Sequence, residues 1–408
     1  MSNVALAIRE AVESSPSSTA VVDGERAYSY RELWIAAGEF AGGLREFDVG
    51  TGDAVGICLE NGLEFVVSVI GTLRNGSRPI VISPDAASAD RNAVLEGSEA
   101  AVVILHDDAV SSVLGANLGL DAVVHLEGEE NLGVAYEEFT DTDGLYDFWE
   151  TFKREPTDPA LAVYGWLRAD ATAGAEYSHE SVAANVRAVR ETVPGGLSEG
   201  DGQLAAMPAY HPFSLLPVLL STLVAGASYR VLQSRSLEAT IEALDSGSVT
   251  VLQLAEPMLR QLAGAGPFAE ADLSAVRAVG CLGDRFPAET RDRVRAAGCE
   301  RCFQLIGQPR TAPAMVASVD DVGDGVLGRA PSGCTLRVVG PDFGERPPVP
   351  ADADGVPEGC LGELVVSGPV TATYGPSADA VTTVDGERWY HTGLRAYRGT
   401  DGVLYAGE

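Results

Sequence analysis

Apolar residues follow two different periods along the first hundred residues of the chain. Apolar positions at helical spacing predict helices over residues 4–15, from Ser29 to Leu44, over 63–74 and near 88–97. Short and almost unbroken apolar runs predict strands over residues 18–23, 54–59, 78–83 and 100–105. Because strands that are apolar on both faces alternate with helices, the pattern predicts parallel sheets covered by helices on both sides.

The pattern changes twice further along the chain. Residues 127–159 are acidic and poorly periodic, which indicates a connector. The acidic run within it, at 127–149, is most simply a solvated loop, with metal binding as the alternative. The alternation of strands and helices returns from Leu161 to about Val319. After Gly325, short strands are separated by Gly-Pro and Asp-Gly turns, which is typical of a small β-barrel-like unit.

We therefore predict an α/β fold with three parts. Two doubly wound α/β lobes with parallel sheets are intertwined within residues 1–325, where about 65–200 form the second lobe. A small distorted β-barrel is expected over residues 326–408. A chain of 408 residues with 46% hydrophobic residues exceeds the size at which one core stops growing, so more than one core is expected.

The charge balance narrows the choice of partners. The chain has 59 acidic and 28 basic residues, a formal net charge of −31, and Lys153 is its only lysine. Nucleic acids and anionic membranes require clustered cations, so we expect neither as a partner. This acidic, arginine-rich composition resembles proteins of salt-loving organisms, in which salt screens the repulsion between carboxylates, and a genome that favours arginine codons is the alternative.

The N-terminal residues and the longest apolar run predict a cytoplasmic protein. The first fifteen residues include Arg9, Glu10 and Glu13 and lack the uninterrupted apolar stretch of a signal peptide. The run at 215–227 is interrupted by Pro217 and is shorter than the ~20 residues needed to cross a bilayer. We expect this run to form a buried helix.

The six cysteines are scattered along the chain. Only Cys299 and Cys302 have the two-residue spacing of a metal or redox pair. No second pair or nearby histidine completes a zinc site. We therefore interpret the cysteines as small apolar residues in a reducing compartment and expect no metal site.

Several segments keep the order and the intervals of one set of motifs. They are AYSYRELW at 27–34, the block at 49–84, DPALAVY at 158–164, MPAYHPFS at 207–214, FQLIGQP at 303–309, the block at 325–339, CLGELVVSGP at 360–369 and WYHTGLRAY at 389–397. Together they resemble the adenylate-forming superfamily of acyl-CoA synthetases, firefly luciferase and peptide-synthetase adenylation domains. The resemblance implies two α/β lobes with a barrel. It also implies the family's reaction, in which a carboxylate attacks Mg-ATP to give an acyl-adenylate and a thiol such as CoA takes the acyl group.

The phosphate-binding loop of that family is only partly represented. The matching segment keeps the family's length, and the residues retained are Tyr164, Gly174, Ser178 and His179. The family's two glycines, two threonines and lysine are replaced by Leu167, Asp170, Arg168, Ala169 and Ala173. Leu167 would block close approach of the backbone to phosphate, and Asp170 would repel it, whereas Arg168 restores only part of the positive charge. Loss of one preorganised donor costs roughly 3 kcal/mol of transition-state stabilisation, so we expect catalysis to be severely impaired.

Two further motif positions also lack the residue that the family uses to hold ATP or its magnesium. In the segment that resembles Tyr-Gly-x-Thr-Glu, Gly307 is retained and Arg310 stands in place of the glutamate that helps to hold magnesium. In the segment that resembles Thr-Gly-Asp, Thr392 and Gly393 are followed by Leu394 in place of the aspartate that holds the ribose hydroxyls. The resemblance also implies that the family's mobile C-terminal domain, which carries a catalytic lysine, is absent.

Three residues have both a functional and a structural interpretation. His211 matches a histidine that lines the acyl pocket in relatives, or it is a turn residue between two prolines. His179 follows Ser178, a residue type suited to capping, so it either starts a helix or takes part in catalysis. Gly283 matches a loop on the adenine side of the site, or it simply ends a strand.

These features predict a ligase-like protein that is catalytically defective, with no assigned catalytic residue. We expect it to bind a small carboxylate or acyl ligand, or a partner ligase. The alternative is an active acid–thiol ligase completed by a separately encoded C-terminal domain, and only this alternative requires ATP and Mg²⁺ as cofactors. A structural subunit of a synthetase complex is a third possibility, for which a large exposed apolar patch would be needed.

Overall fold

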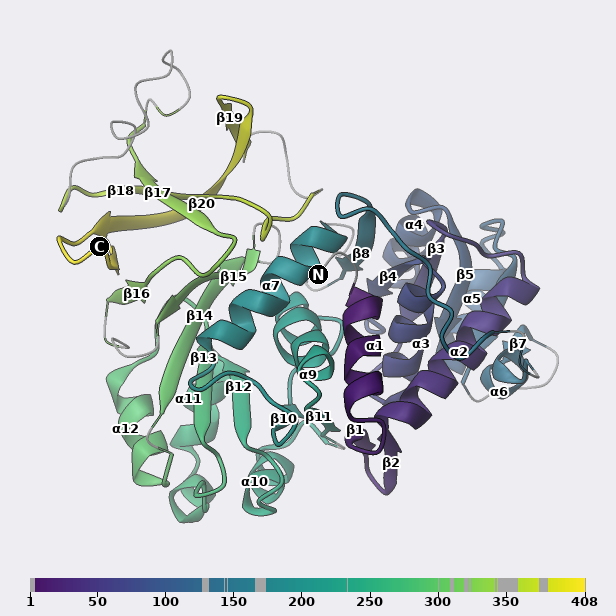
Figure 1. Ribbon diagram of the computed structural model, residues 1–408, viewed down its shortest axis with the longest axis horizontal. Helices are drawn as coiled ribbons and strands as arrows, with labels where there is room; N and C mark the ends of the chain where they lie inside the picture. Colours follow the sequence, from purple (N-terminus) through teal and green to yellow (C-terminus); the bar gives the residue numbers. More distant parts are fainter. Residues whose placement is uncertain are drawn as a thin grey trace.

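The computed structural model of the chain describes residues 4–126, 132–142, 144, 146–165, 174–232, 234–299, 301–308, 312–318, 323, 325–341, 343, 359–373 and 381–407. Within these residues the chain builds two mainly parallel sheets flanked by helices and one antiparallel sheet. Figure 1 shows the two α/β parts side by side, with the antiparallel sheet above the eight-stranded one. The predicted fold class is confirmed.

The first sheet has eight strands in the order β15-β14-β13-β12-β10-β11-β1-β2. Its strands are β1 (Thr19–Asp23), β2 (Arg26–Ser29), β10 (Gly202–Ala205), β11 (Ser228–Val231), β12 (Val251–Ala255), β13 (Ala278–Leu282), β14 (Cys302–Gln308) and β15 (Ala312–Ser318). Only the two edge strands, β2 and β15, pair antiparallel with their neighbours. All residues of β13 are buried, which explains its continuous apolar sequence.

The second sheet has seven strands in the order β7-β6-β5-β3-β4-β8-β9. Its strands are β3 (Ala54–Cys58), β4 (Arg78–Ile82), β5 (Ala100–Leu105), β6 (Ala122–His125), β7 (Val134–Ala135), β8 (Pro159–Tyr164) and β9 (Ala175–Ser178). Here only β9 runs antiparallel to its neighbour. The chain therefore leaves the first sheet after β2, completes the second sheet, and returns to the first sheet at β10.

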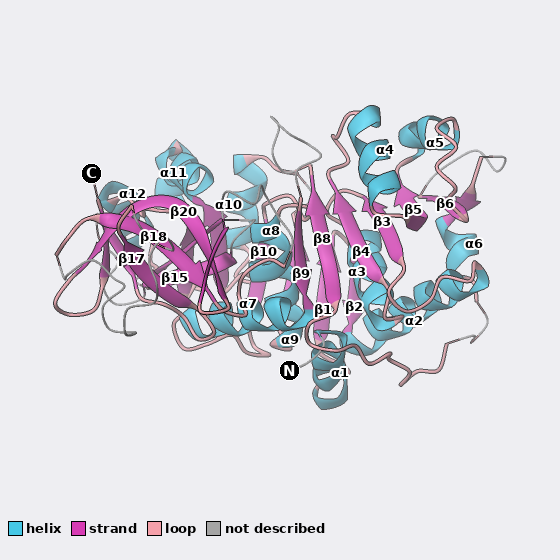
Figure 2. Ribbon diagram, turned by 90° about the horizontal axis from the view of Figure 1, so that it is seen from above, coloured by secondary structure: helices cyan, strands magenta, loops and turns pink. Residues whose placement is uncertain are grey.

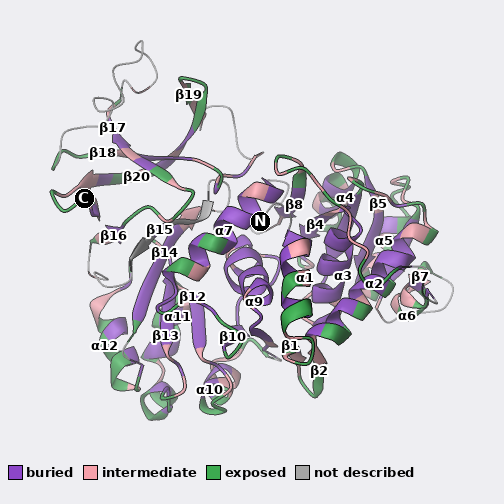
Figure 3. Ribbon diagram, in the orientation of Figure 1, coloured by how far each residue is buried: buried purple, intermediate pink, exposed green. Residues whose placement is uncertain are grey.

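Helices cover both sheets. On the sides that face each other lie α1 (Val4–Ser14), α2 (Tyr30–Glu46), α3 (Leu63–Arg74), α7 (His179–Thr192) and α9 (Ser221–Val224). On the outer sides lie α4 (Ser88–Gly97), α5 (Asp107–Leu114), α10 (Leu237–Asp245), α11 (Glu256–Gly264), the 3-10 helix η2 (Gly266–Glu270) and α12 (Ala288–Ala296). Helices α3 and α7 contact strands of both sheets, so they join the two parts into one body. Figure 3 shows that these shared elements are largely buried.

The antiparallel sheet has its own small core. Its strands are β16 (Val326–Gly328), β17 (Thr335–Val339), β18 (Gly362–Ser367), β19 (Val381–Val384), β20 (Glu387–Arg398) and β21 (Leu404–Ala406). The order is β16-β21-β20-β18-β17, and β19 also pairs with β20. Buried side chains such as Leu336, Leu364, Val366 and Tyr390 pack together on one face of this sheet.

Two segments differ from the sequence-based expectation. The apolar run that begins at Leu215 is buried as predicted, but its first part is a π-helix, η1 (Leu215–Leu220), rather than an α-helix. Pro217 lacks an amide N–H, and its carbonyl accepts a hydrogen bond from the hydroxyl of Ser221, so the regular ladder is interrupted there. The acidic connector, predicted to be irregular, contains α6 (Tyr136–Thr140), because Phe139 packs edge-on against Phe40 with ring centroids 5.2 Å apart.

Within the part of the chain that the structure describes, no helix combines the length and the apolar character needed to span a membrane.

A partly buried ion pair holds the amino ends of the first sheet together. Asp201, just before β10, accepts hydrogen bonds from Arg277 Nε at 2.7 Å and Nη2 at 2.9 Å, from Thr250 Oγ1 at 2.7 Å and from Ser198 N at 2.9 Å. Burial by itself would raise the pKa of the Asp201 carboxyl, but hydrogen bonds from Arg277 and Thr250 outweigh it and lower the pKa to about 2.

We expect Asp201→Asn to lower the free energy of unfolding by about 2 to 3 kcal/mol, because the substitution leaves the Arg277 guanidinium without its counter-ion. Urea unfolding near neutral pH measures this loss. The control is Asp292→Asn, because Asp292 is 74% exposed in its pair with Arg295 and should contribute less than about 1 kcal/mol. Equal effects of the two substitutions would contradict a structural role for the Asp201 pair.

Candidate functional site

The ends of the segment that matches the phosphate loop lie on two adjacent strands. Tyr164 ends β8, and Ser178 ends β9, the antiparallel neighbour of β8. Gly174 lies directly against the ring of Tyr164, and a Cβ at this position would overlap with that ring. Glycine is therefore required here for packing, whatever the role of the loop. Arg168 lies outside the described residues, as do Leu167, Ala169, Asp170 and Ala173.

Ser178 and His179 form the start of α7. The Ser178 hydroxyl accepts a hydrogen bond from the backbone N–H of Ser181 at 3.2 Å, so Ser178 is an N-cap as predicted. His179 is the first helical residue and is only 2% exposed. Its Nδ1 atom has no hydrogen-bond partner among the described residues. Burial, assisted by the nearby Arg154, lowers the pKa of His179 to about 4, so the ring is neutral at physiological pH.

The lowered pKa of His179 predicts a loss of stability in mild acid. Because the folded-state pKa, about 4, lies below the ordinary value of 6.5, the unfolded chain takes up a proton first as the pH falls. The contribution of His179 to stability should therefore be fully present above pH 6.5 and should decrease as the pH falls to about 4. Below that pH, this residue should cause no further change.

We expect the free energy of unfolding, measured with urea, to fall by about 2 to 3 kcal/mol more in the wild type than in His179→Leu between neutral pH and about pH 4. The variant serves as the control for the carboxylates that also titrate in this range, since both proteins share them. Parallel stability curves for the two proteins would show that the buried ring does not stay neutral.

A second group of candidate residues lies where the first sheet meets the antiparallel sheet. Gly307 lies in β14, at an irregularity in its pairing with β15. The amide of the next residue, Gln308, donates a hydrogen bond to the carbonyl of Thr392. Gly393 has a positive φ of 71°, and its N–H donates to Glu363 Oε1 at 3.1 Å. The structure thus brings Gly307, Thr392 and Gly393 together, although more than eighty residues separate the two segments in sequence.

The position expected to hold ribose hydroxyls is apolar and packed inward. The hydroxyl of Thr392 donates to the carbonyl of Leu364 at 2.6 Å and accepts from the N–H of Leu394 at 3.1 Å. These bonds fix the turn, and the Leu394 side chain packs against the core of the antiparallel sheet. The leucine side chain offers no acceptor for a hydroxyl group.

His211 and Gly283 lie at the carboxyl ends of neighbouring parts of the first sheet. His211 follows β10 and caps the one-turn helix α8 (Pro212–Ser214), where its Nδ1 accepts a hydrogen bond from the N–H of Phe213 at 3.2 Å. Burial lowers the pKa of His211 to about 4. Gly283 follows β13, and its carbonyl accepts from the amide of Gln304 at 3.0 Å. Ligands of open α/β sheets bind at such carboxyl ends, which makes this edge the candidate site.

One residue that joins the two lobes at this edge was missed by sequence reasoning. Asn61 follows β3 of the second sheet, and its amide nitrogen donates to the carbonyls of Met207 at 2.8 Å and Ala205 at 3.1 Å. Its amide oxygen accepts from the N–H of Ala209. Asn61 therefore positions the loop that carries His211. The available signal was its place directly after a predicted strand, in the block at 49–84 that resembles the family's motif.

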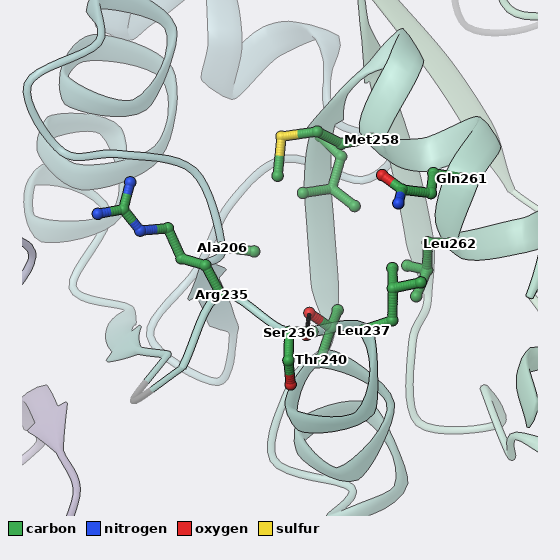
Figure 4. A pocket seen from close by; sticks show the side chains of 9 residues that line it. Ala206, Arg235, Ser236, Leu237, Thr240, Met258, Gln261 and Leu262 are labelled. Carbon is green, nitrogen blue, oxygen red and sulfur yellow. Dashed lines mark hydrogen bonds between the residues drawn. The ribbon is translucent and has the colours of Figure 1, made fainter.

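A small hollow lies beside this edge, between α10 and α11. Its volume is about 90 Å³, and it is lined by Ala206, Arg235, Ser236, Leu237, Thr240, Leu254, Met258, Gln261 and Leu262. Figure 4 shows the Arg235 guanidinium pointing away from the apolar side chain of Met258. Arg235 instead forms an ion pair with Glu60 of the second lobe. A hollow of this size accommodates only a few heavy atoms and does not define a substrate site.

The cysteine pair has the character of buried packing residues. Cys299 and Cys302 are both buried and not disulfide-bonded, and burial raises the pKa of the Cys302 thiol. In the described ranges, no three His, Cys, Asp or Glu side chains are grouped closely enough to hold a metal ion.

The two lobes, the antiparallel sheet and the residues at their junction define an AMP-binding domain of the adenylate-forming, acid–thiol ligase-like class. The chain belongs to the family described as AMP-binding enzyme, which matches residues 8–165 and 171–374.

Relatives by sequence include plant and bacterial CoA ligases. The chain is 25% identical over 406 residues to 4-coumarate–CoA ligase 3 from Oryza sativa subsp. japonica, a match that covers 91% of this chain and 68% of that ligase. It is 26% identical over 398 residues to a feruloyl-CoA synthase from Amycolatopsis sp, covering 96% and 75% of the two chains.

Solved structures share the fold. The N-terminal domain of FACL13 from Mycobacterium tuberculosis has a TM-score of 0.83 and 18% identity, with 100% of both chains covered. A benzoate CoA ligase from Burkholderia xenovorans LB400 has a TM-score of 0.82 and 21% identity, with 100% of this chain and 80% of the ligase covered. At this identity the likeness establishes the fold alone.

Proposed function

We propose that this protein is a ligase-like member of the AMP-binding family that binds a carboxylate or acyl ligand and forms acyl-adenylates poorly or not at all. The observation that carries the proposal is the position of Leu394, whose side chain packs against the core of the antiparallel sheet. In the family pattern this position carries the aspartate that holds the ribose. Without that carboxylate, the position has no charged acceptor for the ribose hydroxyls.

The identities of other residues support the same conclusion. Arg310 stands where the family has a magnesium-holding glutamate, and Asp170 stands in the phosphate loop in place of a glycine. By the family pattern, the first change removes a metal ligand, and the second would add a negative charge to the loop that binds phosphate. Because these two positions concern the triphosphate and its magnesium while Leu394 concerns the ribose, all three changes weaken binding of the same nucleotide.

The carboxylate class is proposed from the relatives and from the site. The names of the sequence relatives include 4-coumarate and feruloyl-CoA ligases, which supports aromatic carboxylates as the first probes. Loss of nucleotide binding does not by itself remove an acyl pocket, since such a pocket is built from side chains of the sheet and of the loop that carries His211. A partner ligase or a separately encoded C-terminal domain is the proposed partner, and the cytoplasm is the proposed location.

Carboxylate-dependent ATP–pyrophosphate exchange tests the proposal. With 4-coumarate, ferulate and benzoate, at high salt, we expect exchange no higher than in the blank without carboxylate, because the triphosphate lacks its protein ligands. The feruloyl-CoA synthase of the Amycolatopsis strain is the positive control. Exchange that appears on addition of a partner domain and disappears in Arg168→Ala would overturn the proposal in favour of an active ligase.

A reciprocal substitution tests the Leu394 argument directly. We expect Leu394→Asp to tighten adenosine binding about tenfold or more, since a hydrogen bond to a charged acceptor contributes about 1.5 to 3 kcal/mol. Isothermal calorimetry measures the affinity. Leu394→Asn is the matched control, because it has the same shape as aspartate without its charge. Identical affinities for the wild type and both variants would show that Leu394 is not what prevents nucleotide binding.

A further inference from the structure

Three side chains on one face of the antiparallel sheet form a continuous hydrogen-bonded chain. The hydroxyl oxygen of Thr382, on β19, lies 2.8 Å from Nε2 of His391 on β20. The other ring nitrogen of His391, Nδ1, lies 3.0 Å from Oε2 of Glu363 on β18. The other carboxylate oxygen of Glu363, Oε1, accepts a hydrogen bond from the N–H of Gly393 at 3.1 Å, so both oxygens of the carboxylate are hydrogen-bonded.

With an ionised Glu363 and a neutral His391 ring, the chemistry of these groups gives the direction of each hydrogen bond. An ionised carboxylate can only accept, so Nδ1 of His391 must carry the proton that it shares with Glu363. In the neutral ring, Nε2 is then the acceptor, and the Thr382 hydroxyl must be the donor. The order hydroxyl, imidazole and carboxylate is that of an activated nucleophile, its general base and the group that orients the base.

The surroundings leave this chain of groups both ordered and accessible. Thr382 is paired with Trp389 across a hairpin whose turn residues, Asp385 and Gly386, have positive φ angles of 53° and 84°, as in the tight turn that matches strand twist. The side chain of His391 is 24% exposed and that of Glu363 is 36% exposed. Thr382 is itself of intermediate exposure, so the sheet holds the geometry while all three groups remain partly open to solvent among the described residues.

We propose that Thr382 is a nucleophile for acyl transfer and accepts acyl groups from activated esters. In the acylation step, the Thr382 oxygen forms a bond to the acyl carbon while its proton passes to Nε2 of His391. The ester C–O bond then breaks, and the leaving alcohol takes the proton from His391. The product is an ester on Thr382, and slow attack by water, assisted by the same histidine, releases the carboxylic acid.

This activity does not depend on the proposed function, because the three residues use neither nucleotide nor metal. The simpler reading is a purely structural contact that fastens β19 to β18. The two interpretations use the same Thr382 oxygen and differ in what it does: acyl transfer places a covalent acyl group on this oxygen, whereas a structural contact does not.

The test uses the full chain and 4-nitrophenyl acetate as the probe. We expect a burst of 4-nitrophenol close to one equivalent, with one acetyl group located on Thr382 by peptide mass spectrometry. The background from amines is low, since Lys153 is the only lysine. Thr382→Val should abolish the burst, and His391→Asn should slow it about 100-fold. Glu363→Gln should slow it at least about tenfold, because the base loses its orienting charge.

Two further variants separate reactivity from folding. Thr382→Ser keeps the hydroxyl and should retain the burst, whereas Thr383→Val alters the neighbouring hydroxyl, which faces the other side of β19, and should leave the burst unchanged. Folding of every variant is checked by circular dichroism. A wild-type protein without a burst, a burst that survives in Thr382→Val, or acetyl groups found only at other residues would each overturn the proposal.

Discussion

Burial of parallel strands on both faces is the constraint on which the rest of this structure depends. Strands such as β3 and β13 expose no residue to solvent, so each must be covered by helices on both sides. The chain meets this requirement for two sheets at once by sharing α3 and α7 between them. Because parallel strands end at the same edge, loops from distant parts of the sequence meet there, and this edge carries the candidate site.

The backbone framework at the candidate site is held by contacts within the chain itself. Gly307, Thr392 and Gly393 are held by hydrogen bonds through Gln308, Leu364 and Glu363, and none of these contacts requires a nucleotide. Packing supplies a structural reason for two of the residues that match the family's loop: Gly174 makes room for Tyr164, and Ser178 caps α7. The presence of these two residues is therefore compatible with the proposed loss of catalysis.

The antiparallel sheet is more than a cover for the first sheet. Glu363 accepts hydrogen bonds from both His391 and Gly393, so the same carboxylate orders the candidate site and the chain that ends at Thr382. A single irregular stretch of β20, between its pairings with the two ends of β18, places Thr392 and Gly393 at this junction. The irregularity in β20 therefore positions both the residues at the candidate site and the hydrogen-bonded chain that ends at Thr382.

The sequence by itself determined the regular elements, the fold class and the identities of the altered motif residues. Segments such as α3 and β5 were predicted with their observed bounds because their apolar period is local and needs no partner to be recognised. The N-cap at Ser178 was predictable for the same reason, since the cap and the amide that it binds lie three residues apart.

Only the tertiary structure decided the features that depend on distant partners. The π-helix at Pro217 and the helix at Phe139 were missed, because each is set by side-chain contacts rather than by periodicity. Asn61 contacts a loop almost 150 residues further along the sequence, and Gln308 contacts Thr392, which is 84 residues further along. No local sequence pattern therefore predicts either hydrogen bond. Whether two distant side chains form a hydrogen bond depends on their positions in the folded structure, which sequence spacing does not give. Burial of a strand, in contrast, can be recognised from the apolar residues of the strand itself.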